Sequence, residues 1–153
     1  MKKLRIYIDT SVLGGCLDEE FAEESKALLE MAQRGDITLV LSDLLAAEVL
    51  RAPDEVKAVF ETLPEESLEL VERSADTERL RDMYLAAGVV GHAATDDAHH
   101  VALATWAGAD VLVSWNFRHL VHFEKIRGYN SVNLREGYPA LEMRSPREIV
   151  ETV

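Results

Sequence analysis

The sequence predicts a single α/β domain built around a central, mostly parallel β-sheet. The chain has 153 residues, a length that fits one domain with a sizeable buried core. Short apolar runs that suit buried strands alternate with segments of helical periodicity, as in βαβ units. No internal repeat, low-complexity segment or linker interrupts this alternation. We therefore expect one domain over residues 1–153, with a core over about residues 4–135 and a C-terminal extension over residues 136–153.

The expected strands are short runs of aliphatic and β-branched residues, bounded by polar or turn-forming residues. The first run, Leu4 to Ile8, ends at Asp9. The run from Asp110 to Ser114 has the near-continuous apolar character of a strand that is buried on both faces. In order, the expected strands cover residues 4–8, 37–41, 68–72, 110–114 and 131–135.

The expected helices are recognised by apolar residues on one side and by start and stop signals. Gly35 follows the first helix as a stop, while Ser42 and Thr95 are expected N-caps of later helices. Residues 145–148, Ser-Pro-Arg-Glu, fit a capping box at the start of a last helix. The other expected helices cover residues 21–33, 43–51, 53–62, 76–87, 96–106 and a stretch after residue 114 that ends near residue 126.

The chain is acidic, with 28 Asp and Glu against 16 Lys and Arg and a net charge of −12. An anionic surface repels phosphate backbones, so broad electrostatic binding of nucleic acid is not expected. Any action on RNA or DNA would need a local basic patch, bound cations or a basic partner chain.

No apolar run approaches the length of a membrane span, and Asp9 interrupts the apolar run near the start, which argues against a cleaved signal. Cys16 is the only cysteine, so no internal disulfide can form, and this fits a reducing compartment. We therefore expect a cytoplasmic protein that does not engage membranes.

Three acidic residues are placed for chemistry rather than for packing. Asp9 follows the first strand, at the edge where open α/β sheets bind ligands, although an Asp before Thr-Ser is also an ordinary helix cap. Glu48 stands within an apolar helical stretch, where it either points outward to Arg51 or needs a partner such as a metal ion. Asp96 and Asp97 open a later helix, where the helix dipole alone accounts for one acid. The small apolar residues that follow place Asp97 at the mouth of a buried helix.

Asn116 follows a late strand just as Asp9 follows the first, so these polar residues are expected to meet at one edge of the sheet. Three close carboxylates raise each other's pKa values unless a cation lies between them. Mg²⁺ or Mn²⁺ suits such oxygen ligands, whereas no Cys-x-x-Cys or His-Glu-x-x-His pattern supports zinc. His100, one turn after Asp97, is interpreted as a structural residue rather than as a ligand.

In four ordered segments the chain resembles the PIN domain family, and within it the VapC-type toxins and their relatives. The segments are residues 7–12 (Tyr-Ile-Asp-Thr-Ser-Val), 42–50 around Glu48, 97–104 (Asp-Ala-His-His-Val-Ala-Leu-Ala) and 109–116 (Ala-Asp-Val-Leu-Val-Ser-Trp-Asn). Their order and spacing cover most of the chain, from residue 5 to about residue 135.

The resemblance implies a Rossmann-like α/β/α sandwich and a ribonuclease that depends on Mg²⁺ or Mn²⁺. It implies that Asp9, Glu48 and Asp97 are the catalytic residues and hold the ion. Three hydroxyl groups are then expected to donate hydrogen bonds that aim these carboxylates, namely those of Thr10, Ser11 and Ser114. For partners, the resemblance implies an antitoxin and a homodimer.

Asn116 stands where many PIN domains carry a fourth acid, and it is the expected fourth metal ligand. An amide oxygen can bind Mg²⁺, but it lowers the formal ligand charge from −4 to −3. Weaker metal binding, a single bound ion, or reduced activity would follow. The alternative interpretation is therefore a PIN-like binding or assembly module without catalysis.

The segment after Asn116 is locally basic, which would meet the need for a positive patch. Its expected contacts to the RNA backbone are Arg118, Lys125 and Arg127. Trp115 or Phe117 would stack on a base in one interpretation and belong to the core in the other, which is the commoner case. Phosphotransfer folds fit less well, because Ser11 stands where a haloacid dehalogenase-like phosphatase needs an acid. A receiver domain would also need a lysine after a late strand, where residues 111–115 offer none.

Overall fold

Five parallel strands form one sheet at the centre of the molecule, as a computed structural model that describes residues 2–152 shows. The strands are β1 (Leu4–Ile8), β2 (Ile37–Ser42), β3 (Leu68–Val71), β4 (Val111–Val113) and β5 (Glu142–Arg144). Their order across the sheet is β3-β2-β1-β4-β5, and every neighbouring pair is parallel. This confirms the predicted α/β architecture with a central parallel sheet.

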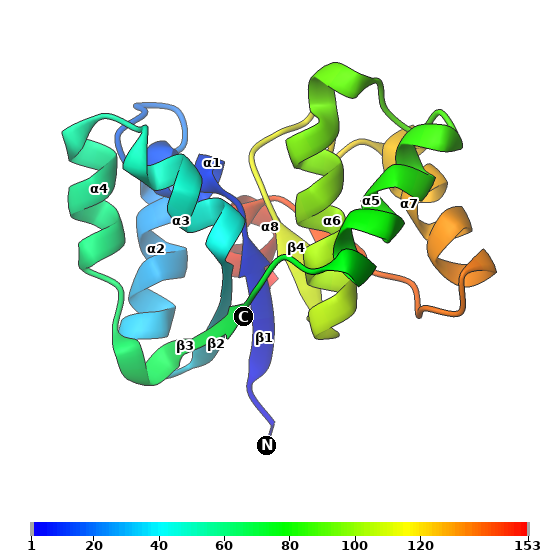
Figure 1. Cartoon of the computed structure of the whole chain (residues 1–153). Coiled ribbons are helices and arrows are strands. Elements are labelled where there is room, and N and C mark those ends of the chain that lie inside the picture. Colours follow the sequence, from blue (N-terminus) through cyan, green and yellow to red (C-terminus); the bar gives the residue numbers. More distant parts are fainter. Residues whose placement is uncertain (1, 153) are drawn as a thin grey trace.

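Helices cover both faces of this sheet. They are α1 (Thr10–Gly15), α2 (Ala22–Gln33), α3 (Asp43–Leu50), α4 (Asp54–Glu61), α5 (Ala75–Ala86), α6 (Thr95–Ala107), α7 (Phe123–Arg135) and α8 (Pro146–Thr152). In Figure 1, β1 rises from the N-terminus through the middle, with α2 and α4 on one side and α5, α6 and α7 on the other. The carboxyl ends of the strands therefore face the upper side of that view.

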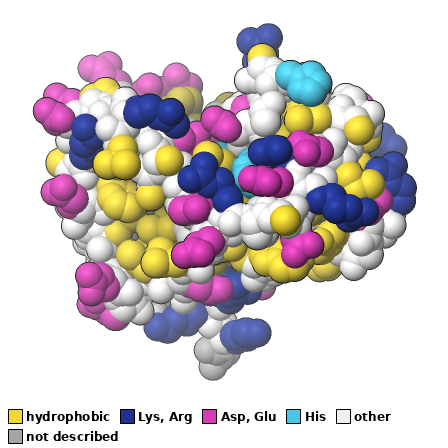
Figure 2. All heavy atoms as spheres, viewed as in Figure 1, with side chains coloured by type: hydrophobic (Ala, Val, Ile, Leu, Met, Phe, Trp, Pro, Cys, Tyr) yellow, Lys and Arg dark blue, Asp and Glu magenta, His cyan; other side chains and the backbone are white. Residues whose placement is uncertain are grey.

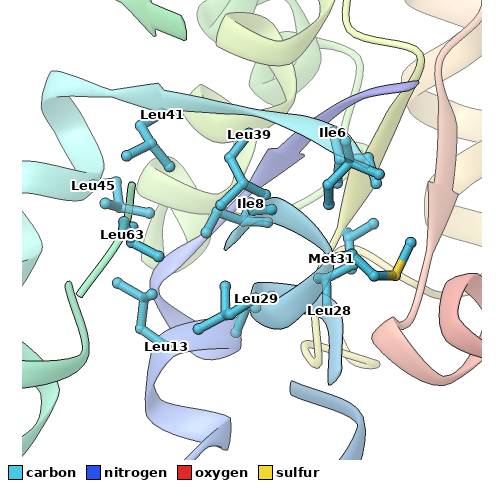
Figure 3. Packing of buried hydrophobic residues seen from close by; sticks show 14 of the residues in the cluster. Ile6, Ile8, Leu13, Leu28, Leu29, Met31, Leu39, Leu41, Leu45 and Leu63 are labelled. Atoms are coloured by element: carbon cyan, nitrogen blue, oxygen red, sulfur yellow. The ribbon is translucent and has the colours of Figure 1, made fainter. Parts of the chain in front are cut away.

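The alternation of side chains along β1 divides the core into two clusters. Ile6 and Ile8 point to one face, where Figure 3 shows them packed with Leu28 and Leu29 of α2. Tyr7, between them, points to the opposite face and joins the cluster formed with α5, α6 and α7. Because β1 lies in the middle of the sheet and is buried on both faces, the residue that follows it emerges at a rigid, central point.

The prediction of a strand over residues 131–135 is wrong, because these residues form the last part of α7. The run Ser-Val-Asn-Leu-Arg alternates polar and apolar residues, which suits a strand. In the structure, Tyr129, Val132 and Asn133 instead form the buried side of a helix, and Leu134 is exposed. The helix expected to follow β4 directly also begins later, since turns occupy residues 117–122 before α7.

The fifth strand is β5, a three-residue segment in the part of the chain expected to be a C-terminal extension. It pairs with β4 at the edge of the sheet, and α8 then packs against α2. The expected capping box of α8 is present, because Ser145 Oγ accepts from the Glu148 N–H and the Glu148 carboxylate accepts from the Ser145 N–H, each at 3.4 Å.

Helices α6 and α1 also differ from the prediction. Thr95 is the first residue of α6 rather than its cap, and its hydroxyl donates to the carbonyl oxygen of His92 in the preceding 3₁₀ turn. The short helix α1 was not among the predicted helices, and Gly14 and Gly15 in it have low helix propensity. Ser42, in contrast, caps α3 as predicted, because its Oγ accepts from the N–H of Leu45.

The surface carries charges of both signs. On the face drawn in Figure 2, acidic and basic side chains intermingle near the middle, and hydrophobic side chains gather over the half that carries α3 and α4. Between residues 2 and 152, no helix is both long and apolar enough to cross a membrane.

Candidate active site

The carboxyl edge of the sheet brings together the three acids singled out in the sequence. Asp9 follows β1, Glu48 extends from α3, and Asp97 lies in the first turn of α6. The charges of Asp9 and Glu48 both raise the pKa of Asp97, and the charge of Glu48 raises that of Asp9. The charges of the three carboxylates therefore act on one another.

Asp9 is buried, and a serine hydroxyl donates to each of its carboxylate oxygens. Ser11 Oγ lies 2.6 Å from Oδ1, and Ser114 Oγ lies 2.7 Å from Oδ2. Burial raises the pKa of Asp9, while the charge of His100 and the two serine hydrogen bonds oppose that rise. Asp9 occupies the N-cap position of α1, but its side chain accepts no capping hydrogen bond from a backbone N–H of that helix. The carboxylate is thus held by the two serines rather than used as a helix cap.

Glu48 is held through a single oxygen. Its Oε1 accepts from Thr10 Oγ1 at 2.7 Å and lies 2.8 Å from His100 Nε2. Burial raises the pKa of Glu48, but the hydrogen bond and charge of His100, together with Thr10 and Arg51, outweigh it, so the pKa lies below its usual value. Arg51, the partner expected for an outward-pointing Glu48, acts only as a more distant charge. The side chain keeps 25% of its surface exposed, which leaves it accessible from solvent.

His100 is buried and connects Glu48 to the core, a contact that sequence analysis did not predict. Its Nδ1 lies 2.6 Å from the hydroxyl of Tyr7, which lies 2.8 Å from Ser42 Oγ. Burial lowers the pKa of His100, but the hydrogen bond to Glu48 and the charges of Glu48, Asp9 and Asp97 together outweigh it, so the net shift is upward. The sequence did contain a signal for this contact. Tyr7 faces the interior in the middle of a buried strand, and a buried phenol needs a hydrogen-bond partner.

Asp97 and its neighbour Asp96 differ in environment. Asp96 is exposed, as expected for an acid that only complements the helix dipole, whereas Asp97 is half-buried. Burial is the largest cause of the raised pKa of Asp97, followed by the charge of Asp9, while His100 and His119 lower it. Among the described residues, no side chain donates a hydrogen bond to the Asp97 carboxylate. It is therefore the acid of the three whose oxygens are free to bind another group.

The donor set fits a hard divalent cation. It consists of carboxylate oxygens that repel one another, which Mg²⁺ and Mn²⁺ prefer and whose repulsion they relieve. Between residues 2 and 152, however, no three His, Cys, Asp or Glu side chains converge closely enough to form a ready metal cluster. A cation would have to draw the carboxylates closer together.

Asn116, the expected fourth ligand, shapes the turn after β4. Its Oδ1 accepts from the backbone N–H groups of Arg118 and His119, at 3.1 and 2.9 Å. Its own N–H donates to Ser114 Oγ at 2.9 Å. An amide oxygen has two lone pairs, so binding a metal would cost at least one of these turn hydrogen bonds.

The three basic residues expected to contact RNA have different surroundings. Arg118 is exposed in the turn after β4, where its N–H donates to Asn116 Oδ1. Lys125 Nζ donates to the carbonyl oxygen of Val89, and Arg127 lies over the ring of Phe123.

The two aromatic residues considered for base stacking also differ. Trp115 is buried, stacks on Phe21 and donates from Nε1 to Ser25 Oγ, so it is a core residue. Phe117 keeps 47% of its surface exposed.

Comparison with known proteins agrees with this architecture. The PIN domain family model matches residues 5–118 of the chain. Among solved structures, VapBC2 from Rickettsia felis bound to a DNA fragment from their promoter has a TM-score of 0.55 and 14% identity. That match covers 93% of this chain and 98% of the other. VapC20 of Mycobacterium tuberculosis, a Sarcin-Ricin loop cleaving toxin, has a TM-score of 0.55 and 16% identity, over 74% of this chain and 91% of that one. No curated protein sequence matches the chain. At these identities the solved structures establish a shared fold.

Proposed function

Because the chain belongs to the PIN domain family, we propose that it is a ribonuclease that hydrolyses RNA phosphodiester bonds with the help of Mg²⁺ or Mn²⁺. One observation carries the proposal. Three mutually repelling carboxylates lie at the carboxyl edge of the sheet, and two of them accept hydrogen bonds from neighbouring hydroxyl groups. Such an arrangement costs stability, so it is expected where a cation and a reaction use it.

Asp9, Glu48 and Asp97 would hold the cation. The cation would supply activation of a water molecule and stabilisation of negative charge on the phosphate. Ser11 and Ser114 fix both oxygens of Asp9. We assign acceptance of a proton from the attacking water to Asp97, whose carboxylate is free of side-chain hydrogen bonds and whose pKa is raised, chiefly by burial.

The decisive experiment removes the charge from two of the acids. Asp9→Asn together with Asp97→Asn should abolish Mg²⁺-dependent cleavage of RNA. Asp96→Asn is the matched control, since it removes the same charge from the exposed neighbouring residue and should leave cleavage unchanged. Cleavage at the unaltered rate by the double variant would refute the assigned site.

On the substrate side, we propose that Arg118 contacts the RNA backbone, with Lys125 and Arg127 farther along the same segment. A chain of net charge −12 needs such a local contact to bind RNA. Arg118→Ala should weaken RNA binding and lower the slope of log affinity against log salt by about 1. Arg34→Ala, an exposed arginine that precedes β2 at the opposite edge of the sheet, should change neither. An unchanged affinity and slope for Arg118→Ala would remove this residue from the contact surface.

We further propose that the protein is the toxin of a type II toxin–antitoxin system and acts in the cytoplasm as a homodimer restrained by an antitoxin. The fold that it shares with VapBC2 and VapC20 supports this role. Induced expression should arrest growth, and co-expression of a small neighbouring gene should restore it. Growth arrest by the double variant Asp9→Asn, Asp97→Asn would show that the toxicity does not come from cleavage at the assigned site.

A non-catalytic PIN-like module is the second candidate, and Asn116 is the observation that favours it. Its oxygen carries no charge and already accepts two backbone hydrogen bonds. Calorimetric titration with Mn²⁺ separates the two candidates. A nuclease should bind the ion and lose that binding in Asp9→Asn, whereas an assembly module need not bind it.

A further inference from the structure

A continuous chain of hydrogen bonds runs from the core to the candidate metal site. It links Ser42 Oγ to the Tyr7 hydroxyl, that hydroxyl to His100 Nδ1, and His100 Nε2 to Glu48 Oε1, over distances of 2.8, 2.6 and 2.8 Å. Tyr7, Ser42 and His100 are all buried. Since water cannot replace these partners, each hydrogen bond in the chain limits the direction of the next.

The ionised Glu48 fixes that direction, because a carboxylate can only accept. His100 must therefore carry a proton on Nε2. If the ring is neutral, its Nδ1 is bare and accepts from the Tyr7 hydroxyl. The Tyr7 hydroxyl then gives its one proton to the ring instead of to Ser42 Oγ, which still accepts from the Leu45 N–H.

A second arrangement keeps the hydrogen bond that Tyr7 donates to Ser42. If both ring nitrogens carry protons, Nδ1 donates to the Tyr7 oxygen and the Tyr7 hydroxyl donates to Ser42. In both arrangements His100 donates from Nε2 to the same oxygen of Glu48, and neither ring nitrogen is left to bind a metal.

We propose that His100 is a positioning residue that holds Oε1 of Glu48 and leaves Oε2 of that carboxylate for the cation, with Tyr7 fixing the orientation of the imidazole ring. The consequence for metal binding rests on the proposed function. The hydrogen-bond direction itself is a property of the metal-free protein. Partners of this kind behind a metal ligand typically change metal affinity by 10- to 100-fold when removed.

Two substitutions of His100 separate positioning from space filling. Glutamine places its amide nitrogen near Nε2, so His100→Gln keeps a donor to Glu48. Asparagine places its amide group near Nδ1, so His100→Asn keeps a partner for Tyr7 but loses the donor to Glu48. We expect His100→Asn to weaken Mn²⁺ binding by about 10- to 100-fold in calorimetry and His100→Gln to bind almost as the unaltered protein does. Equal Mn²⁺ affinities in the two variants would overturn the proposal, and thermal unfolding checks that both are folded.

A measurement without metal keeps the inference independent of catalysis. Nitrogen-15 NMR of the metal-free protein should show a proton on Nε2 of His100, and Tyr7→Phe should perturb the Nδ1 signal of the same ring. A proton on Nδ1 with a bare Nε2 would overturn the inference, even if both His100 variants fail to fold. If the protein binds Mn²⁺ in this His100-dependent way but does not cleave RNA, the proposed function fails and the positioning role stands. If it binds no Mn²⁺, the proposed function again fails and the NMR result alone decides.

Discussion

Replacing Ser114 by alanine tests whether Asp9 is held as a charged group in a buried site. Ser114 Oγ donates to Asp9 Oδ2 at 2.7 Å and accepts from the Asn116 N–H at 2.9 Å, and Ser114 is fully buried. A hydrogen bond to a charged group contributes about 1.5–3 kcal/mol, and an unpaired buried N–H costs about 1–3 kcal/mol. Because Asn116 is only half-buried, water recovers part of the second cost. We therefore expect Ser114→Ala to lower the free energy of unfolding by about 2–4 kcal/mol.

This loss should depend on pH in a defined direction. The Ser114 hydroxyl favours the ionised form of Asp9, so its removal raises further a pKa that burial already raises. The folded variant then takes up a proton more readily than the folded unaltered protein does. The difference in unfolding free energy between the two should consequently shrink as the pH falls from neutral through the pKa of Asp9. Urea unfolding over a pH series, in the presence of a chelator, measures it.

Ser67→Ala is the matched control for this experiment. Ser67 is also buried, but its Oγ donates to a neutral group, the carbonyl oxygen of Ala32, at 2.7 Å. We expect a loss of about 0.5–1.5 kcal/mol that does not vary over the same pH range. If Ser114→Ala costs no more than Ser67→Ala, or costs the same at every pH, then Asp9 is not held as a charge by Ser114.

Three further predictions follow from the structure. Gly15→Ala would place a Cβ 2.6 Å from Trp115 Nε1 and should lower the free energy of unfolding in urea by about 1–3 kcal/mol. Gly14→Ala, with open space around it, should cost nothing, and equal costs for the two variants would contradict this prediction. Burial lowers the pKa of His99 to about 4. As the pH falls, His99 is therefore protonated in the unfolded chain at a higher pH than in the folded protein, and the free energy of unfolding decreases between about pH 6.5 and pH 4. His99→Gln should remove up to about 3 kcal/mol of that pH dependence, and an unchanged pH profile would refute it. Asn116→Asp keeps an acceptor for the two turn N–H groups and adds a charge, so Mn²⁺ should bind several-fold more tightly in calorimetry; unchanged affinity would show that residue 116 faces away from the ion.

The regular part of the fold could be predicted because local and tertiary preferences agree there. The run Leu4 to Ile8 is apolar except for Arg5 and lies in the middle of the sheet, where its last three residues are buried. The prediction of secondary structure failed where local and tertiary preferences conflict. Residues 131–135 alternate like a strand, yet the spacing of Tyr129 and Val132 suits the helix that packs on the core. Strand β5 has only three residues and two of them are charged, so its sequence carries no strand signal.

For the site, the sequence singled out three acids but did not indicate how each is held. Position relative to strand ends and helix starts was enough to single out Asp9 and Asp97. The partners of a side chain depend on rotamers and on residues distant in sequence, such as the contact of His100 with Tyr7, 93 positions away. Asn116 shows the same limit, because its role in the turn depends on backbone N–H groups that no sequence pattern displays.

The position of Asp9 directly after β1 means that strand pairing and site assembly are one event. Tyr7 pairs with Leu112 and Ile8 with Val113, so the next residues, Asp9 and Ser114, come to lie side by side. A slip of one residue would reverse the faces of Tyr7 and Ile8 and carry Asp9 away from its serine. A misregistered chain would thus lose its core and its site together. The proposed cleavage would then begin only in chains whose central strand has reached its native pairing, so no partly folded form would cut RNA.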